Sequence, residues 1–382
     1  MAKGYVFAAA GTAGHIYPAV AVAEALVERG VDPGEVTFVT SRRKVEQEIF
    51  SSLPYPRIDM DMSGVRGRNP LRLALALWRL GVSTWRLRTA FARMHPAAVA
   101  VFGGYISLAA AVAARSLWLP VVVVETNSVM GRANRLASRL AIRTFRSFEE
   151  GVPGSGVPGS GVPGSGVPLR APVISLKPDA AMRRELVASL GFDPEDVKRL
   201  VCVFGGSLGS RRINEAAVRM LEEDASSVPA EGTAYLVVLG RRDEAEFSPR
   251  LSRLAAGGKV KVVSRGYEER LYAFMACSDA VVCRAGSNTV AELDLFGVPA
   301  VLVPLPGSPG DHQAKNASWL ADRGTAVVLG DAGCDAASLR RALGELETKA
   351  AAFEVRRAGG AREQVPDSAA EIAAYLRDHF AG

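Results

Sequence analysis

Short apolar runs alternate with stretches of helical period along the first part of the chain. A helix is predicted at residues 16–29, where apolar residues recur every three or four positions until Gly30 ends the pattern. Around it the sequence predicts apolar strands at 5–10, 36–40, 98–102, 121–124 and 142–145. Continuous apolar strands separated by helices are typical of a parallel sheet that helices cover on both faces.

The same alternation starts again near residue 200. Strands are predicted at 200–204, 235–239, 260–264, 280–283, 300–304 and 326–329. Helices are predicted at 212–222, 268–277, 289–296 and 313–322, with a closing amphipathic helix at 368–380. The predicted fold class is therefore α/β, with two Rossmann-like, doubly wound parallel-sheet domains.

A low-complexity segment separates the two halves. The pentapeptide GVPGS occurs three times in succession from residue 151 and then begins again. Pro-Gly pairs favour turns and a few valines cannot bury a core, so we expect a flexible linker at 151–170. A repeat this regular is typical of an engineered insert or of a slippage product. The predicted domains are 1–150 and 171–360, and residues 361–382 are expected to form a C-terminal helix that packs back on the first.

Composition and hydropathy predict a cytoplasmic protein. The chain has 382 residues, of which 48% are hydrophobic and 23% charged, as in ordinary globular proteins. No secretory signal opens it, and Gly103, Gly104, Arg115 and Pro120 interrupt the longest apolar region, so no membrane-spanning helix is predicted. The four cysteines form no CxxC pair, which favours buried free thiols over disulfides or a metal site.

Positive charge is concentrated in one segment. The net charge is +6, and no acidic residue lies between Asp61 and Glu125. Eight arginines lie there: Arg66, Arg68, Arg72, Arg79, Arg86, Arg88, Arg93 and Arg115. Such asymmetry attracts an anionic partner, which could be phospholipid, nucleic acid or a phosphorylated substrate.

Residues 70–94 of this segment are predicted to form one long helix. Arginines recur on it at every seventh position beside an apolar stripe: Arg72, Arg79, Arg86 and Arg93, next to Leu71, Leu75, Trp78, Val82 and Trp85. A basic stripe beside tryptophans is typical of a helix lying on anionic lipid. The alternative is a helix packed on its own domain with solvated arginines; both hold if only the first turns, with residues 65–68, are exposed.

In each half of the chain, a glycine-rich turn follows the first predicted strand. Gly11-Thr12-Ala13-Gly14-His15 leads into a helix whose first N–H groups can bind a phosphate. His15 is placed there either as a catalytic base or, like most lone histidines, as a structural residue. The run 205–209 forms a second anion-binding turn with the Ser207 hydroxyl but without the lysine of a Walker A loop. Arg241 and Arg242 after the next predicted strand keep an NADP site open.

A third turn carries more charge. The run from Cys283 to Glu292 leads from a strand into a helix, so Arg284 can neutralise a diphosphate while N–H groups of Ser287 to Thr289 bind it. Glu292 could accept hydrogen bonds from a ribose diol, or it could be an ordinary surface carboxylate. The cluster Asp311-His312-Gln313 with Asn316 suits sugar hydroxyls and is a poor metal site.

Taken together, these strings resemble the MurG-type peptidoglycan N-acetylglucosaminyltransferases over most of the chain outside the repeat. The motifs are GTAGHIYPAVAVAEAL, SGVRGR, FGGYISLAAAVAAR, ETNSVMGRANRLAS, FGGSLGSRRIN, CRAGSNTVAEL, GVPAVLVPLP and DHQAKNA. The resemblance implies a GT-B fold with a cleft between its domains. It also implies an inverting transfer, without metal or other cofactor, from UDP-N-acetylglucosamine to the C4 hydroxyl of lipid-linked N-acetylmuramoyl-pentapeptide. The protein would be peripheral on the anionic cytoplasmic leaflet and would bind no nucleic acid.

The resemblance also assigns site residues. His15 would be the base, and the donor site would be formed by Thr12, Ala13, Gly14, Asn127, Ser207, Tyr267, Glu268, Arg284, Ser287, Asn288, Thr289, Val290, Ala291, Glu292 and Gln313. The backbone near Tyr267 and Glu268 would contact uracil. Acceptor and membrane contacts would come from Gly103, Gly104, Tyr105, Arg66, Arg68, Arg72, Trp78 and Arg79.

The chain departs from this family pattern at three places. Ala13 replaces a loop glycine, a His-Glu-Gln-Asn run reads 124–127 VETN, and Asn-Pro-Val-Arg reads 171–174 APVI, which removes an arginine that Arg170 could replace. These changes lie on the acceptor and hinge side. Three alternatives therefore stay open: a related transferase with another sugar or acceptor, an NADP oxidoreductase, and a non-catalytic module that binds a membrane surface.

Overall fold

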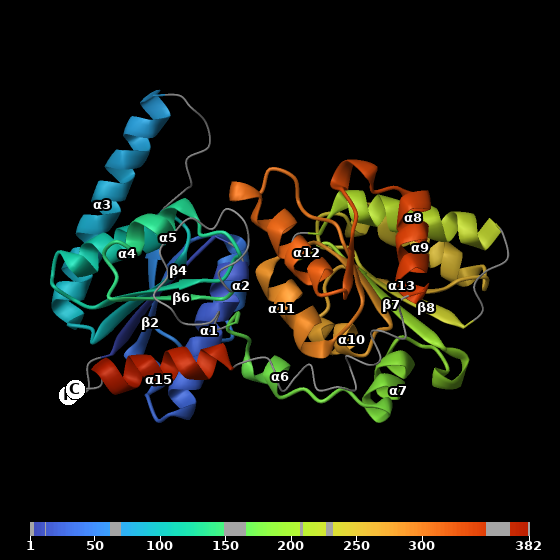
Figure 1. The fold of residues 1–382 in the computed structure, drawn as a ribbon, viewed down its shortest axis with the longest axis horizontal. Helices are drawn as coiled ribbons and strands as arrows, with labels where there is room; N and C mark the ends of the chain where they lie inside the picture. Colours follow the sequence, from blue (N-terminus) through green and yellow to red (C-terminus); the bar gives the residue numbers. More distant parts are fainter. Residues whose placement is uncertain are drawn as a thin grey trace. The chain divides into compact units, whose positions relative to one another are not determined.

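The computed structural model describes residues 4–11, 13–61, 70–148, 166–206, 209–226, 232–348 and 367–380. The chain forms two compact units. Unit 1 comprises Met1–Ile174 with Pro366–Gly382, and unit 2 comprises Ser175–Val365. Figure 1 shows unit 1 in blue to green with one red helix, and unit 2 in green to orange. Most of the repeat, residues 151–165, lies outside the described residues.

The sheet of unit 1 has six parallel strands in the order β3-β2-β1-β4-β5-β6. Their bounds are β1 Tyr5–Ala9, β2 Val36–Ser41, β3 Arg57–Met60, β4 Ala98–Gly103, β5 Val121–Glu125 and β6 Arg143–Arg146. The helices are α1 Ala13–Glu28, η1 Pro33–Glu35 (a 3₁₀ turn), α2 Lys44–Phe50, α3 Pro70–Met94, α4 Tyr105–Arg115, α5 Arg132–Ala137, α6 Ala171–Ile174 and α15 Ser368–Phe380.

Alternate residues of β1 are buried in two different cores. Phe7 points to the side of α1 and α15, where Ile16 and Leu376 are also buried. Val6 points to the other side, where Phe91 of α3 and Ile106 of α4 are buried. A strand that is buried on both faces needs apolar residues at every position, which explains why it reads as a continuous apolar run.

Unit 2 repeats this plan with the order β12-β11-β10-β7-β8-β9, again parallel throughout. Its strands are β7 Arg199–Phe204, β8 Thr233–Val238, β9 Lys261–Arg265, β10 Ala280–Cys283, β11 Ala300–Leu302 and β12 Ala326–Val328. Its helices are α7 Ala180–Ser189, η2 Pro194–Asp196, α8 Arg211–Ser226, α9 Glu244–Ala256, α10 Leu271–Ala276, α11 Ser287–Phe296, η3 Pro309–Asp311, α12 His312–Asp322, η4 Asp331–Gly333 and α13 Ala336–Thr348.

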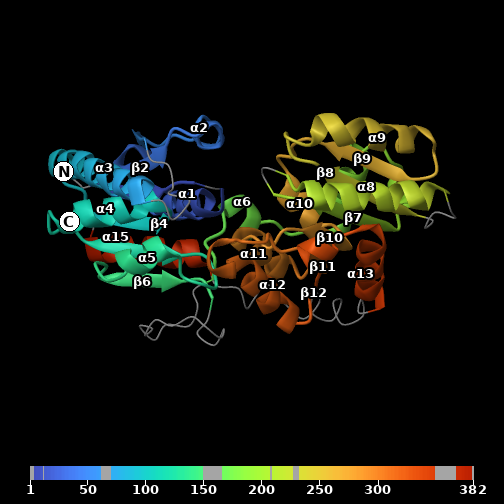
Figure 2. The same ribbon diagram turned by 90° about the horizontal axis from the view of Figure 1, so that it is seen from above.

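Helices cover both faces of this second sheet as well. One core joins the sheet to α8, α9 and α13 through residues such as Val203, Ile213 and Leu339. Figures 1 and 2 show α11 and α12 on the opposite side from α8 and α9. The predicted fold class, two Rossmann-like doubly wound parallel sheets, is therefore confirmed.

Helix α15 returns to unit 1 at the end of the chain. Ile372 and Leu376 are fully buried beside α1, and the Tyr5 hydroxyl donates to the Leu376 carbonyl oxygen at 3.4 Å. The sequence patterns missed β3 and several helices, among them α2, α4 and α9. Strand β3 is at the sheet edge with only Met60 buried, so it lacks the apolar run that identifies the inner strands.

Candidate active site

Both sheets have a topological switch point at their carboxyl edge. In unit 1 it lies between β1 and β4, and in unit 2 between β7 and β10, because successive strands are added in opposite directions from these pairs. Loops that leave such a pair diverge to opposite faces of the sheet, and ligands of open α/β sheets bind in the crevice between them. The three predicted glycine turns follow β1, β7 and β10, and the predicted acceptor residues Gly103 and Gly104 lie at the end of β4.

The first turn is held in place at Gly11. This residue has φ +106°, where a glycine is favoured, and its N–H donates to Glu46 at 2.9 Å. The Arg43 guanidinium donates to its carbonyl oxygen at 3.2 Å. Helix α1 begins two residues later, so Ala13, Gly14 and His15 form its first turn as half-buried residues. Thr12 lies outside the described residues.

The His15 ring lies against Gly103 at the end of β4. A Cβ atom added to Gly103 would be 2.6 Å from His15 Cδ2 and 2.8 Å from Nε2, and Gly103 has φ +124°. Only glycine therefore allows the imidazole to occupy this position. Gly104, at φ +83°, is similarly constrained by the Ala10 carbonyl oxygen, and Tyr105 begins α4 as an exposed residue. The structure thus brings the predicted base and the predicted acceptor loop together.

A buried carboxylate organises the loop after β5. Glu125 is 2% exposed and accepts hydrogen bonds from Asn127 N at 3.0 Å, Asn127 Nδ2 at 3.2 Å, Gly131 N at 3.0 Å and Asn134 Nδ2 at 3.0 Å. These bonds fix the half-buried Asn127 side chain at the same sheet edge. Glu125 is present in the family-like motif, but the sequence alone did not assign it a role.

In unit 2 the turn after β7 is equally tight. A Cβ atom on Gly205 would be 2.1 Å from the Ser210 amide nitrogen, and one on Gly209 would be 2.3 Å from the Leu239 carbonyl oxygen. The backbone can approach this closely only without side chains. Ser207 lies outside the described residues.

The loop after β9 presents an aromatic ring. Tyr267 is 55% exposed, and the Arg241 guanidinium lies 5.8 Å from its ring centroid. The Glu268 carboxylate forms an ion pair with Arg265 and accepts from the Arg270 amide at 2.8 Å. The Glu268 side chain is thus engaged within its own loop.

Arg284 is bound to protein groups in this structure. Its Nη1 atom donates to Asp331 Oδ1 at 2.6 Å and to the carbonyl oxygens of Val303 and Pro304 at 3.1 and 3.3 Å. The side chain is 13% exposed. The sequence did not identify Asp331, because it lies 47 residues away in a different loop. Any diphosphate at this edge would meet an arginine that a carboxylate already partly neutralises.

Helix α11 begins directly after this arginine. Its N-cap is Gly286, and Ser287, Asn288 and Thr289 form its first turn, whose N–H groups have no partner within an α-helix. Further along, Glu292 is half-buried next to Ala291 and Val290, and burial raises its pKa to about 8.

Two further predicted side chains have defined partners. Gln313, in the first turn of α12, accepts from the Leu305 amide at 2.9 Å through Oε1, and so holds the loop after β11. The fully buried Asn316 donates to the Ala285 carbonyl oxygen at 3.2 Å, which ties α12 to the Arg284 loop. The predicted donor residues described in unit 2 therefore lie in loops, or near the starts of helices, that follow the carboxyl ends of its strands.

Helix α3 separates its apolar residues into two faces. Leu87 and Phe91 are fully buried against α4, whereas the exposed fractions of Leu77, Trp78 and Trp85 are 60%, 65% and 67%. Arg79, Arg86 and Arg93 are exposed as well. The tryptophan stripe is therefore distinct from the face that packs on the sheet. Arg66, Arg68 and the Arg72 side chain lie outside what the structure describes.

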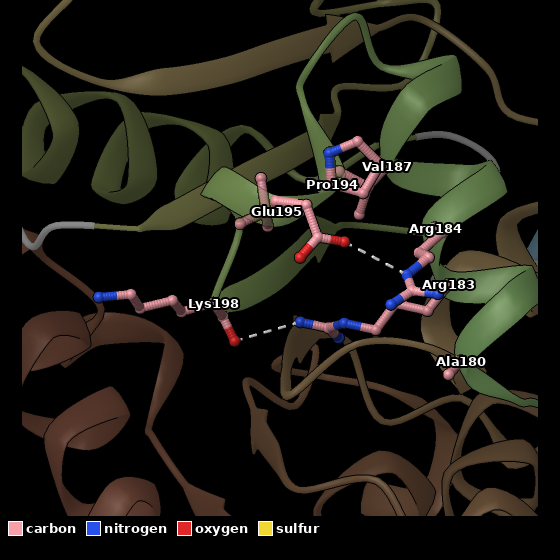
Figure 3. Close-up of a pocket in the computed structure, with 8 residues that line it drawn as sticks. Ala180, Arg183, Arg184, Val187, Pro194, Glu195 and Lys198 are labelled. Carbon is pink, nitrogen blue, oxygen red and sulfur yellow. Dashed lines mark hydrogen bonds and ion pairs between the residues drawn. The ribbon is translucent and has the colours of Figure 1, made fainter.

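A small hollow lies at the opposite, amino-terminal edge of the second sheet (Figure 3). Its volume of about 260 Å³ is below the range of roughly 300–1,000 Å³ typical of small-molecule sites. Arg183 in its wall donates to Asp279 and to the carbonyl oxygens of Cys277 and Lys198. These bonds join α7 to the sheet, so the hollow is part of the packing of unit 2.

Within the described ranges, no group of three His, Cys, Asp or Glu side chains is arranged to hold a metal. All four cysteines are buried and free, as predicted for the cysteines in apolar runs, and burial raises the pKa of Cys202 to about 12. No helix among the described residues is long and apolar enough to span a membrane.

Comparisons with known proteins agree with this geometry. Residues 5–146 match the N-terminal domain of glycosyltransferase family 28, and residues 200–372 match its C-terminal domain. A Methylococcus capsulatus protein is 31% identical over 97% of this chain and 98% of its own length. A Nitratidesulfovibrio vulgaris (Hildenborough) protein is 33% identical over 84% of this chain and 82% of its own length.

Both relatives are named UDP-N-acetylglucosamine–N-acetylmuramyl-(pentapeptide) pyrophosphoryl-undecaprenol N-acetylglucosamine transferase. Among solved structures, MurG of Acinetobacter baumannii aligns with a TM-score of 0.71 at 24% identity. The alignment covers 98% of this chain and 99% of that structure, which supports the same two-domain fold.

Proposed function

Because the chain belongs to glycosyltransferase family 28, we propose that it is an inverting N-acetylglucosaminyltransferase of the MurG type. It moves N-acetylglucosamine from UDP-N-acetylglucosamine to the C4 hydroxyl of undecaprenyl-diphosphate-linked N-acetylmuramoyl-pentapeptide, a step of peptidoglycan synthesis. The observation that carries this proposal is His15 at the switch point of unit 1, packed against Gly103, in a chain whose relatives are named for this reaction.

His15 is the proposed general base. Its imidazole takes the proton from the C4 hydroxyl while that oxygen attacks C1 of the donor sugar. The new bond joins O4 to C1, and the bond from C1 to the β-phosphate oxygen breaks with inversion. UDP leaves with the electron pair of the broken bond. Glycosyl transfer of this kind needs a base on the acceptor side and positive potential around the leaving group.

Unit 2 is the proposed donor site. The first-turn N–H groups of α11 face the diphosphate, where the helix dipole stabilises the charge that develops on UDP. Glu292 accepts from the ribose hydroxyls, and Gln313 contacts the sugar. In unit 2, Ser207 and the backbone at Tyr267 and Glu268 complete the donor contacts, and Asn127 is a donor contact proposed in unit 1. Arg284 contributes positive charge to this site, and its ion-pair partner Asp331 partly neutralises that charge.

No metal or organic cofactor takes part in the proposed reaction. The residues offered to the diphosphate are amide groups and a guanidinium, which stabilise the leaving group directly. Turnover measured in buffer with EDTA is expected to equal turnover with added Mg²⁺. A strict requirement for Mg²⁺ would contradict this part of the proposal.

Helix α3 is the proposed membrane contact, on the cytoplasmic face of the cell membrane. Its exposed tryptophans and arginines combine apolar insertion with attraction to anionic lipid. Trp78→Ala is expected to weaken binding to phosphatidylglycerol vesicles by roughly tenfold, from the apolar area lost. Trp319→Ala in unit 2 is the matched control. Equal binding of both variants and the wild type would contradict the assignment.

The activity itself is tested with purified protein, UDP-N-acetylglucosamine and the lipid-linked acceptor. The expected product is the disaccharide lipid. Its rate of formation should be far higher than the rate of glucose transfer when UDP-glucose replaces UDP-N-acetylglucosamine. Because Ala13 and the 124–127 and 171–174 runs depart from the family pattern on the acceptor side, lipid acceptors with other head groups belong in the same assay. Turnover with one of those and none with the N-acetylmuramoyl lipid would assign a related transferase instead.

A further inference from the structure

A buried carboxylate outside the predicted site contacts the His15 loop. Glu46 is 1% exposed and lies in α2, which follows β2. Its Oε1 atom accepts from the Gly11 amide at 2.9 Å and from the Ser41 hydroxyl at 2.6 Å, and its Oε2 atom accepts from the Ser41 amide at 2.7 Å. The carboxylate therefore joins the end of β2 to the turn after β1.

The same peptide segment is held from its other side. Arg43, the residue before α2, donates to the Gly11 carbonyl oxygen at 3.2 Å. Both the N–H and the C=O of Gly11 thus have charged partners from one short helix and its N-cap. Hydrogen bonds to charged groups are about twice as strong as neutral ones. They act on a glycine at φ +106°, whose backbone would otherwise have wide conformational freedom.

We infer that Glu46 and Arg43 are positioning residues for His15. They fix the Gly11 peptide two residues before α1 begins, and so set the direction in which α1 starts and in which its first turn presents the imidazole. This inference rests on the proposed role of His15 as the base. Neither residue is among the proposed substrate contacts, so their removal is expected to act on the turnover of bound substrates rather than on donor affinity.

Arg43 gives the cleaner test because it is exposed. Arg43→Ala removes the contact with the Gly11 carbonyl without opening a cavity. The matched control is Arg42→Ala, the neighbouring exposed arginine, whose nearest acidic partner is Asp61 at 3.6 Å. We expect kcat to fall by about threefold to tenfold for Arg43→Ala alone, since small displacements of a catalytic group have effects of this order or larger. The Kd for UDP should be unchanged in both variants.

Glu46→Gln is the stronger perturbation. The glutamine side chain has one accepting oxygen and one donating NH₂ group. The backbone N–H of either Gly11 or Ser41 would therefore face that NH₂ group instead of an acceptor. We expect kcat to fall by about 10- to 100-fold, with an unchanged Kd for UDP. Glu48→Gln makes the same chemical change on an exposed residue of the same helix and is the control. Melting temperatures of all variants separate a local from a global effect.

A double-mutant cycle ties the effect to His15. If Glu46 and Arg43 act by placing the imidazole, Arg43→Ala and Glu46→Gln should cost little further activity once His15 is alanine, because residues that act as a unit are non-additive. Full additivity would overturn the inference, as would wild-type kcat in Arg43→Ala and in a folded Glu46→Gln.

The two proposals fail in different ways. If His15→Ala retains wild-type turnover, the base assignment is wrong whatever the other variants do. If His15→Ala loses activity while Arg43→Ala equals Arg42→Ala and a folded Glu46→Gln equals Glu48→Gln in kcat, the base assignment stands and the positioning inference is wrong. If Glu46→Gln does not fold, the comparison of Arg43→Ala with Arg42→Ala still decides the inference.

Discussion

The two switch points of this protein have the same topology and opposite arrangements of charge. In unit 1, charged side chains hold the backbone: Glu46 and Arg43 bind the two polar groups of Gly11. In unit 2, the backbone holds a charged side chain: the carbonyl oxygens of Val303 and Pro304, together with the Asp331 carboxylate, bind Arg284.

This difference shows how one framework supplies two functions. Six parallel strands in the same order create a switch point in each unit, but the order of strands does not decide what binds there. A fixed turn that presents an imidazole is suited to proton transfer. A fixed guanidinium beside a helix N-terminus is suited to anion binding. Variants that remove these features test whether unit 1 serves proton transfer and unit 2 serves anion binding.

Removal of the imidazole should have the largest effect. His15→Ala deletes the proposed base, and we expect kcat to fall by about 10²- to 10⁴-fold, the usual contribution of general base catalysis. The Kd for UDP should stay within twofold, because the imidazole is proposed to contact the acceptor hydroxyl rather than UDP. Calorimetry with UDP and a turnover assay check both statements. His379→Ala, on the exposed side of α15, is the control; a similar loss in both variants would point to a general defect.

A substitution that crowds the imidazole should have the next largest effect on kcat. Gly103→Ala places a methyl group 2.6 Å from His15 Cδ2 and forces alanine to φ +124°. We expect kcat to fall by roughly 10- to 100-fold and the free energy of unfolding by about 1–3 kcal/mol. Gly344→Ala in α13, where nothing lies within 4 Å of the added atom, should change neither turnover nor stability in that direction. Wild-type turnover of Gly103→Ala would mean that His15 acts from another position.

The fold could be predicted from the sequence because its inner strands are buried on both faces. Continuous apolar runs such as 98–102 and 200–204 correspond to β4 and β7 within one residue at each end. Strand β3 and helices α2 and α9 carry mixed polar residues, since one face of each meets solvent, and their patterns are weaker. Edge position and partial burial therefore account for what the patterns missed.

The location of site residues was predictable from sequence only where those residues lie within one short continuous motif. The run 283–292 contains a strand end, a turn and a helix start, so its location at the carboxyl edge follows from local signals. Glu46 and Asp331 are different, because they reach Gly11 and Arg284 across 35 and 47 residues of sequence. Tertiary contacts of this kind bring lone acidic residues to a loop, and no spacing rule identifies them in one sequence.

Donor binding should depend on the titration of Glu292. Burial raises the pKa of this carboxyl to about 8, so it is protonated in the free protein at neutral pH and ionises above that value. A carboxylate accepts from both ribose hydroxyls more strongly than the protonated form does. UDP affinity is therefore expected to rise by roughly tenfold between pH 6 and pH 9. Glu292→Gln should remove this rise, whereas Glu345→Gln on the exposed side of α13 should keep it.

The same pKa makes a prediction for stability. A carboxyl whose pKa is raised from 4.5 to about 8 in the folded state contributes most below pH 4.5, and this contribution is lost as pH rises to 8. The difference in unfolding free energy between the wild type and Glu292→Gln should thus shift in favour of the variant from pH 5 to pH 8. A difference that stays constant over this range would show that the carboxyl titrates normally.

The smallest effect concerns the charge that Asp331 withholds from a ligand. Asp331→Asn keeps an oxygen that can accept from Arg284 but removes one negative charge beside the proposed diphosphate site. We expect UDP to bind about twofold to fivefold more tightly at low salt, with the gain shrinking as salt screens the charge.

The control for this variant is Asp335→Asn, an exposed carboxylate four residues further along, which should leave the Kd for UDP unchanged. Asp331→Asn should also lower the melting temperature, because the ion pair with a guanidinium only 13% exposed becomes a hydrogen bond from that guanidinium to an uncharged amide. Weaker UDP binding at every salt concentration would mean that Asp331 serves to orient Arg284 rather than to reduce its charge. In that case Asp331 would orient Arg284 toward the ligand, as Glu46 and Arg43 are proposed to orient the turn that carries His15. The two switch points would then differ only in which group is oriented, a guanidinium in unit 2 and a backbone turn in unit 1.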